Sequence, residues 1–171
     1  GSVVLHRATL RLELNTELYE GVRFGFLTVL PGLSERHYGW KVTAVRAVSQ
    51  VKPANYVGFF DAGDEELNRI WWTAVYTVRL TMQADYFGSI LMDRGDRFSW
   101  TGDAHTIQAA ALVAFDNTPF VYQNLNRTSC PTCSNGIEVY ALYWVLSLVD
   151  YWDRTGDEGG VKALCDSAAA K

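Results

Sequence analysis

A short polar stretch between two apolar segments holds residue types that can cleave a glycosidic bond. It runs from Leu91 to His105 and carries three carboxylates, two arginines, a tryptophan and a histidine, at Asp93, Arg94, Asp96, Arg97, Trp100, Asp103 and His105. Cleavage needs one carboxyl group that protonates the leaving oxygen and a second that activates water or attacks carbon. Neighbouring carboxylates raise one another's pKa and arginines lower it, so the stretch can hold carboxyl groups in different protonation states.

Each of these residues also has an ordinary structural explanation. Asp103 fits the first turn of a helix with Thr101 as its N-cap, and His105 lies on that helix beside apolar residues. The two Asp-Arg pairs could be surface ion pairs of little energetic weight, and Trp100 could belong to the core. Residue types and spacing alone therefore leave catalysis as one hypothesis among several.

The segment before the polar stretch begins with β-like patterns. Three runs end at turn signals and read as strands: Val3–Leu14, Val22–Leu30 and Trp40–Val51. Three or four strands are too few to complete a sandwich. Such runs suggest a sandwich or a sheet, and we expect residues 1–56 to be the end of a β domain rather than a whole one.

From about Asp61 the apolar residues recur at intervals of three and four, which is typical of amphipathic helices. The acidic residues at 61–66 predict a helix start, and this helix should end near Asp85. Further helices are predicted over Thr101–Phe115, Pro119–Leu125 and Ile137–Arg154, with a weak last helix after Gly156.

The segment Ile137–Arg154 is apolar on nearly all sides, which predicts a helix buried between neighbours. The chain scarcely supplies those neighbours. The expected fold class is therefore α+β, with strands followed by successive helices, and the chain is expected to be a fragment of a larger protein.

Three segments resemble, in the same order, the catalytic domain of α-L-rhamnosidases in the six-hairpin glycosidase superfamily. Asp96–Ala104 resembles the acid motif of that family, a carboxylate-Arg-x-x-Trp-x-Gly-Asp pattern. Gly63–Trp71 resembles the first helix of the domain, and Gly136–Glu138 with Tyr140–Leu146 resembles a later one. The resemblance implies an (α/α)6 barrel preceded by a β-sandwich, with residues 57–171 as the incomplete N-terminal part of the barrel.

The resemblance also implies roles for individual residues. Asp96 falls at the general-acid position, and Asp103 falls on a carboxylate that contacts the rhamnose. Trp100 would wall the sugar site by stacking. Arg94 or Arg97 would bond sugar hydroxyls or tune Asp96.

One position departs from the family pattern. Leu91 stands where relatives commonly carry a further Asp, and Asp93, two residues later, is the candidate replacement.

The implied mechanism is inverting, with a base about 6.5–9.5 Å from the acid. That base would come from a helix beyond the last residue of this chain. Glu138 is the local alternative, but a residue at a helix start is better explained as a capping or dipole partner, so we expect the chain alone to be inactive.

The expected function is hydrolysis of terminal α-L-rhamnosides in plant glycosides or polysaccharides. Three alternatives stay open: a six-hairpin glycosidase for another sugar, a non-catalytic carbohydrate-binding protein, and a purely structural domain. A downstream segment that carries a Glu would favour the enzyme.

Composition narrows the classes of partner. The net charge of −4 gives no basic surface for nucleic acid, and no apolar run is long enough for a bilayer. The first residues lack the pattern of a signal peptide, and the compartment stays open with secretion slightly favoured. Cys130 and Cys133 predict a loop disulfide or two thiols rather than half a zinc site. We expect no metal and no cofactor.

Overall fold

The computed structural model describes residues 51–88 and 99–169, together with Phe24, Phe26, 43–46 and Val48. The chain divides into two units, Gly1–Gln50 and Val51–Lys171. Every helix in the described part belongs to the second unit.

The β-sandwich expected before residue 57 has no support in the described residues. The predicted strands Val3–Leu14 and Val22–Leu30 fall outside them, apart from Phe24 and Phe26, which are in no strand. The strand predicted over Trp40–Val51 is not formed at the residues of that run that the structure describes, where Val45 and Val48 are highly exposed. A strand needs a ladder of hydrogen bonds with a neighbour, and no neighbouring strand exists among the residues placed here. The α+β class is therefore seen only in its helical part.

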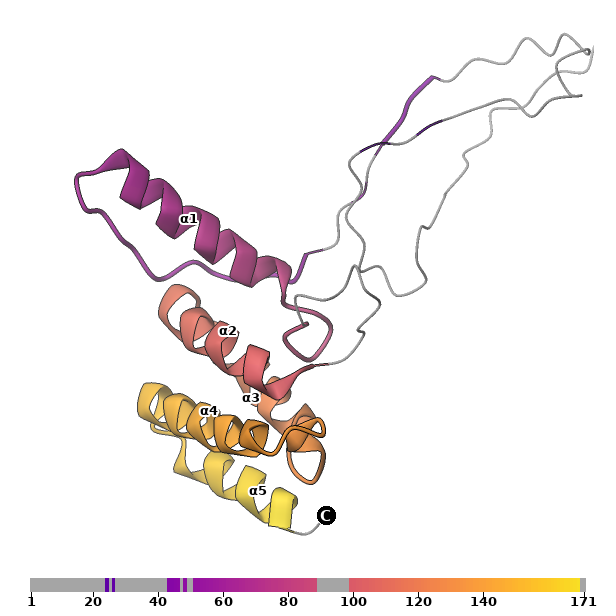
Figure 1. The fold of residues 1–171 in the computed structure, drawn as a ribbon. Coiled ribbons are helices and arrows are strands. Elements are labelled where there is room, and N and C mark those ends of the chain that lie inside the picture. Colours follow the sequence, from indigo (N-terminus) through magenta and orange to yellow (C-terminus); the bar gives the residue numbers. More distant parts are fainter. Residues whose placement is uncertain are drawn as a thin grey trace, which may run out of the picture. The chain divides into compact units, whose positions relative to one another are not determined.

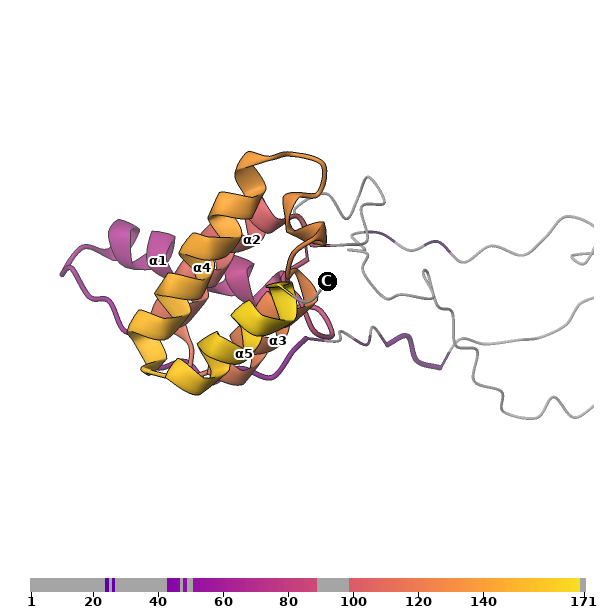
Figure 2. The ribbon, with the colours of Figure 1, turned by 90° about the horizontal axis from the view of Figure 1, so that it is seen from below.

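The second unit consists, over the residues that the structure describes, of five α-helices and one short 3-10 helix. These are α1 (Glu65–Leu80), α2 (Thr101–Ala114), α3 (Thr118–Arg127), η2 (Thr132–Ser134), α4 (Val139–Thr155) and α5 (Glu158–Ala169). In Figure 1, α1, α2, α4 and α5 follow one another from top to bottom, with α3 behind α2 and α4. Figure 2 shows α3 beside α5 from below. The most extensive interface joins α2 to α4.

The start of α1 is set by Asp64. Its carboxylate accepts hydrogen bonds from the backbone N–H groups of Glu66 (2.8 Å) and Leu67 (3.1 Å). Two N–H groups without a partner inside the helix are thereby satisfied. Glu65 and Glu66 add negative charge at the positive end of the helix dipole. The helix start predicted within residues 61–66 is confirmed.

The end of α1 predicted near Asp85 is wrong, because the chain turns back at Thr81. The turn is closed by a hydrogen bond from Gly88 N–H to the Thr81 carbonyl (2.6 Å). Met82 and Phe87 pair across it as an antiparallel bridge, and both side chains are buried. The spacing of three and four between apolar residues continues to Met82. Met82 is nevertheless buried by the reverse turn after α1 and not by a continuation of the helix.

The helix predicted over Thr101–Phe115 is confirmed as α2, and its small residues lie at interfaces. Ala111 and Ala114 are buried. The backbone N–H groups of Val57 and Gly58 both donate to the Ala114 carbonyl at 3.0 Å. A Cβ at Gly58 would lie 2.9 Å from the Ala114 Cα, so only glycine permits this approach.

Local signals also explain the boundaries of the last three helices. Pro119 lies in the first turn of α3, which extends two residues past the predicted Leu125. Gly156 has φ +65° and ends α4 in the left-handed conformation that glycine favours. The weak last helix expected after it is α5.

The prediction that the long helix is buried on nearly all sides is wrong for the described part of the chain. Trp144, Ser147, Leu148 and Tyr151 are buried, on the side that faces α2, α3 and α5. An apolar set on α4 is exposed: Val139, Leu142, Val145, Leu146, Val149 and Trp152. This exposed set agrees with the expectation that the chain supplies few neighbours for this helix.

The connection between α3 and α4 is closed by a disulfide. Cys130 and Cys133 are bonded to each other, which decides between the two states that the sequence left open. Cys133 is buried, and η2 begins between the two cysteines. None of the helices in the described ranges is long and apolar enough to cross a bilayer.

Candidate functional site

The first turn of α2 carries the two predicted site residues that the structure places. Trp100 is the N-cap residue, and Asp103 follows in the first turn, near the positive end of the helix dipole. The alternative with Thr101 as N-cap is wrong. The Thr101 backbone N–H instead donates to the side-chain oxygen of Asn135, 2.8 Å away in the loop before α4.

Tyr140, in the first turn of α4, brings these two residues together. Its hydroxyl donates to Asp103 Oδ2 at 3.5 Å. Its ring meets the Trp100 ring edge-to-face, with 6.5 Å between ring centroids. Tyr143, one turn further along α4, contacts the Tyr140 ring at a centroid distance of 6.0 Å. The result is a carboxylate bordered by aromatic rings, an arrangement that suits a sugar because it offers both a hydrogen-bond acceptor and apolar faces.

Gly102 makes the contact between α2 and Tyr140 possible. A Cβ at Gly102 would overlap the Tyr140 ring, with ring atoms Cζ at 2.6 Å and Cδ1 at 2.8 Å. The ring cannot easily yield, because Trp100 and Tyr143 contact it. The glycine of the Trp-x-Gly-Asp pattern therefore has a packing reason in this chain.

The environment of Tyr140 keeps its hydroxyl protonated. Partial burial raises the pKa of Tyr140, and the negative charge of Asp103 and the hydrogen bond to it raise the pKa further. Any tyrosine is protonated at neutral pH, and the raised pKa keeps Tyr140 a hydrogen-bond donor to a higher pH than an ordinary tyrosine. Tyr140 can therefore donate a hydrogen bond that orients the Asp103 carboxylate without becoming negatively charged itself.

His105 lies one turn beyond Gly102 and has a structural environment. Its Nδ1 lies 3.0 Å from Ser147 Oγ and 3.8 Å from Asp150 Oδ2, and its ring stacks on Tyr143. A Ser-His-Asp triad needs the serine and the aspartate on opposite ring nitrogens. Here both face Nδ1, and Ser147 is buried. The group is therefore not a nucleophilic site, in line with the structural interpretation of His105.

The other predicted site residues fall outside the described part of the chain. Asp93, Arg94, Asp96 and Arg97 all lie within residues 89–98, as does Leu91, the departure from the family pattern. The structure therefore places two of the six predicted site residues, Trp100 and Asp103. Glu138 occupies the N-cap position of α4, is exposed, and makes no capping hydrogen bond with its side chain.

Two residues that contact the site were not singled out as site residues from the sequence. The family resemblance includes Tyr140 only as part of a helix, and Asn135 lies outside it. The Asn135–Gly136 pair signals a tight turn. No local signal points from either residue to the start of α2, because the contacts join positions 34 and 37 residues apart.

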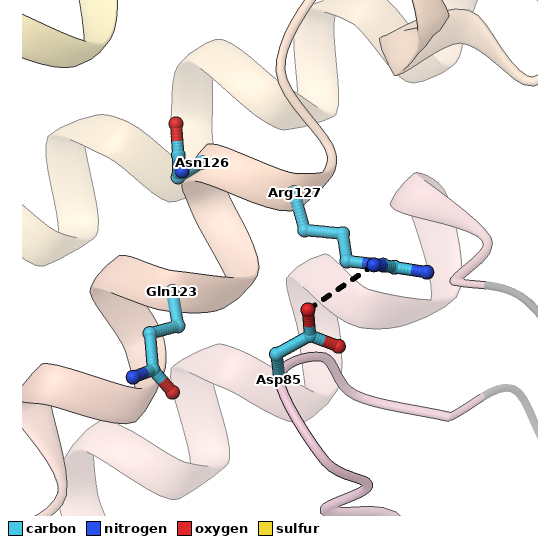
Figure 3. A pocket seen from close by; sticks show the side chains of 4 residues that line it. All are labelled: Asp85, Gln123, Asn126 and Arg127. Atoms are coloured by element: carbon cyan, nitrogen blue, oxygen red, sulfur yellow. Dashed lines mark hydrogen bonds and ion pairs between the residues drawn. The ribbon is translucent and has the colours of Figure 1, made fainter.

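A separate polar recess lies at the end of α3 and is a weaker candidate. It is lined by Asp85, Gln123, Asn126 and Arg127 and has a volume of about 620 Å³ (Figure 3). The Arg127 guanidinium pairs with Asp85 at 3.1 Å, and both side chains are about half exposed. Its lining includes no aromatic ring, so it offers a sugar no stacking face.

No group of three or more His, Cys, Asp or Glu side chains in the described ranges could hold a metal ion. Within the described residues, the Asp103 carboxylate is paired with the Tyr140 hydroxyl.

Comparison with known proteins identifies the family. A model of the bacterial α-L-rhamnosidase six-hairpin glycosidase domain matches residues 55–146, more than half of the chain. The match includes α1, α2, α3 and half of α4, and with them the Asp96–Ala104 motif. No curated protein and no solved structure matches the chain. The chain therefore belongs to the family of bacterial α-L-rhamnosidase six-hairpin glycosidase domains.

Proposed function

We propose that this chain forms the acid-bearing part of an enzyme that hydrolyses terminal α-L-rhamnosides with inversion. The observation that carries the proposal is the family match over residues 55–146, which includes the acid motif. The aromatic and acidic surroundings of the α2 start add support from geometry, since they suit a sugar ring.

In the proposed reaction Asp96 donates its proton to the glycosidic oxygen as the bond to the anomeric carbon breaks. A water molecule attacks the opposite face of that carbon, and a carboxylate about 6.5–9.5 Å from Asp96 removes its proton. That base is proposed to lie outside this chain. The chain therefore supplies the acid and part of the sugar site, and it is expected to be inactive alone.

The remaining motif residues are proposed to hold the rhamnose. Asp103, oriented by Tyr140, accepts hydrogen bonds from ring hydroxyls. Trp100 walls the sugar site by stacking on the rhamnose ring. Arg94 and Arg97 bond hydroxyls or tune the pKa of Asp96, and Asp93 replaces the carboxylate that Leu91 lacks.

The domain division is also part of the proposal. Residues 1–56 are assigned to the end of a β-sandwich domain, and residues 57–171 to the first part of an (α/α)6 barrel. The helical character of α1 to α5 and the family match support the second assignment.

The test uses the full-length protein, the larger protein of which this chain is proposed to be a part. It compares the wild type with its Asp96→Asn variant on two substrates. p-Nitrophenyl α-L-rhamnoside has a leaving group that needs little protonation, whereas an alkyl α-L-rhamnoside needs an acid. General acids contribute about 10²–10⁴-fold to the rate. The variant should therefore lose about that factor on the alkyl substrate and much less on the aryl one. Asp153→Asn, an exposed carboxylate on α4, is the matched control and should change neither rate.

Proton NMR during the first turnovers should show the β-anomer of rhamnose before mutarotation, as inversion requires. An initial α-anomer would overturn the inverting mechanism. A folded protein that hydrolyses no glycoside but binds rhamnose would favour the carbohydrate-binding alternative, and turnover confined to another sugar would replace the substrate.

A further inference from the structure

Asn135 occupies an unusual position in the loop that joins α3 to α4. It follows η2 directly and has φ +49° and ψ +25°, a left-handed conformation that asparagine tolerates better than most residues. Its backbone N–H donates to the Thr132 carbonyl at 3.1 Å. This conformation directs the side chain back toward the start of α2.

The Asn135 amide group bonds the backbone on both sides of Trp100. Its Oδ1 accepts the Thr101 N–H at 2.8 Å, and its Nδ2 donates to the Ser99 carbonyl at 3.1 Å. Both partners lie in the Asp96–Ala104 motif. The Trp100 side chain makes no capping bond, and Asn135, 34 residues after Thr101, satisfies one of the N–H groups at the start of α2 that have no partner within the helix.

The loop that carries Asn135 is held in place on several sides. The Cys130–Cys133 disulfide links the residues just before Asn135, and Cys133 is buried. The Thr132 hydroxyl donates to the Ser129 carbonyl at 3.1 Å. After Asn135, the Ile137 N–H donates to the Ser134 carbonyl at 2.7 Å, just before α4 begins. Asn135 therefore connects the motif by hydrogen bonds to a loop that is itself held by these contacts, and through that loop to the helix that carries Tyr140.

We propose that Asn135 is a positioning residue for the acid motif. By fixing the backbone at Ser99 and Thr101, it sets where Trp100 and Asp103 stand relative to Tyr140, and it fixes one end of the segment that carries Asp96. Asn135 bonds the motif backbone at Ser99 and Thr101 and acts on the site through that backbone. This inference rests on the proposed function, because the motif it positions is assigned to catalysis there.

The test uses Asn135→Gly and Asn135→Asp in the full-length protein. Glycine adopts the left-handed backbone freely, so Asn135→Gly removes both side-chain bonds without backbone strain. Asn135→Asp keeps an acceptor for the Thr101 N–H and loses the donor to the Ser99 carbonyl. Tyr151→Phe, which removes a hydrogen bond at the other end of α4, is the control for a general loss of stability.

Asn135→Gly should lower kcat about ten- to a hundredfold with a smaller change in KM, because small misplacements of catalytic groups reduce rates by such factors. Asn135→Asp should recover part of kcat, and Tyr151→Phe should leave kcat unchanged. Hydrogen exchange at the Thr101 amide should accelerate in Asn135→Gly only, because that substitution removes its acceptor.

A kcat for Asn135→Gly within twofold of the wild type would overturn the proposal. So would a loss of kcat that Tyr151→Phe reproduces, since the role would then be structural. If the wild-type protein hydrolyses no glycoside, the proposed function fails instead, and unchanged exchange at Thr101 in Asn135→Gly would still show that Asn135 does not hold the motif.

Discussion

Helix α4 carries a tyrosine–carboxylate pair at each of its ends, and the two pairs differ in what they leave available. At its start the Tyr140 hydroxyl bonds Asp103 of α2 at 3.5 Å. Near its end the Tyr151 hydroxyl bonds Asp157, just before α5, at 2.9 Å. The first pair joins helices that are distant in sequence, whereas the second closes a link of six residues.

The second pair is fully used within its own segment. Asp157 Oδ2 accepts from Tyr151, and Asp157 Oδ1 accepts the Gly160 N–H at 2.9 Å, in the first turn of α5. For Asp103, the described residues bond only Oδ2. Both oxygens of Asp157 thus bond groups of its own segment, whereas the described residues leave Asp103 Oδ1 available as an acceptor for a ligand. The same pair of side chains therefore serves the fold at one end of α4 and suits a site at the other.

A glycine packs closely against each pair. A Cβ at Gly102 would meet the Tyr140 ring, and a Cβ at Gly160 would meet the Asp157 carboxylate, with Cγ at 2.8 Å. Substituting the two glycines therefore disturbs the two pairs separately.

The largest effect is expected for Gly102→Ala. The added methyl group must displace the Tyr140 ring and with it the bond to Asp103, and overpacking of this kind costs about 1–3 kcal/mol. We expect the affinity for rhamnose, measured by calorimetry on the full-length protein, to fall by at least about tenfold. That loss corresponds to about 1.4 kcal/mol.

Two other glycines serve as controls for this substitution. Gly160→Ala should lower the free energy of unfolding but leave rhamnose affinity unchanged, because it disturbs only the structural pair. Gly159→Ala meets nothing closer than 3.8 Å, so it should leave both quantities unchanged or raise stability slightly. Equal losses of rhamnose affinity in Gly102→Ala and Gly160→Ala would contradict the division between the two pairs.

Some helix boundaries could be predicted from the sequence and others could not. The starts and ends that depend on a neighbouring residue, such as Asp64 at α1 and Gly156 after α4, followed from local signals. The end of α1 did not, because the turn that follows it is held by Asn124, whose side chain accepts the Phe87 N–H across 37 residues.

The residues of the candidate site also divide into those that the sequence predicts and those that only the structure shows. Trp100 and Asp103 were found from the motif and lie together at the start of α2, but Tyr140 and Asn135 act through contacts that no sequence period encodes. Both use polar atoms that fit equally well in a core or a turn, so only the packed structure shows their partners. The assignment of Asp96 as general acid stays a prediction.

A smaller effect is expected for Tyr140→Phe, which removes a hydroxyl and no packing. A single hydrogen bond contributes about 0.5–1.5 kcal/mol, so rhamnose affinity should fall a few-fold. Tyr151→Phe should instead lower the free energy of unfolding by about 1 kcal/mol and leave rhamnose affinity unchanged. Calorimetry and urea unfolding of both variants measure the two quantities. An unchanged affinity in Tyr140→Phe would show that the tyrosine does not orient Asp103 for a ligand.

The smallest effect at neutral pH, and the one that tests the structural pair most directly, is the response to alkali. Burial, with the hydrogen bond to Asp157, raises the pKa of Tyr151 to about 12, above the ordinary tyrosine value of about 10. The unfolded chain therefore loses this proton first as pH rises. The stability that the raised pKa contributes is fully present below about pH 10 and is lost progressively toward about pH 12.

Urea unfolding from about pH 8 to about pH 11 should show this loss in the wild type, and Tyr151→Phe should reduce its slope. Part of the slope should persist in that variant, because the pKa of Tyr140 is raised in the same direction. A double variant, Tyr140→Phe with Tyr151→Phe, should therefore be flatter than either single one. If neither substitution reduces the slope, the hydroxyls at both ends of α4 titrate as they do in water. The distinction between a pair that holds the fold and a pair that faces a ligand would then rest on packing alone.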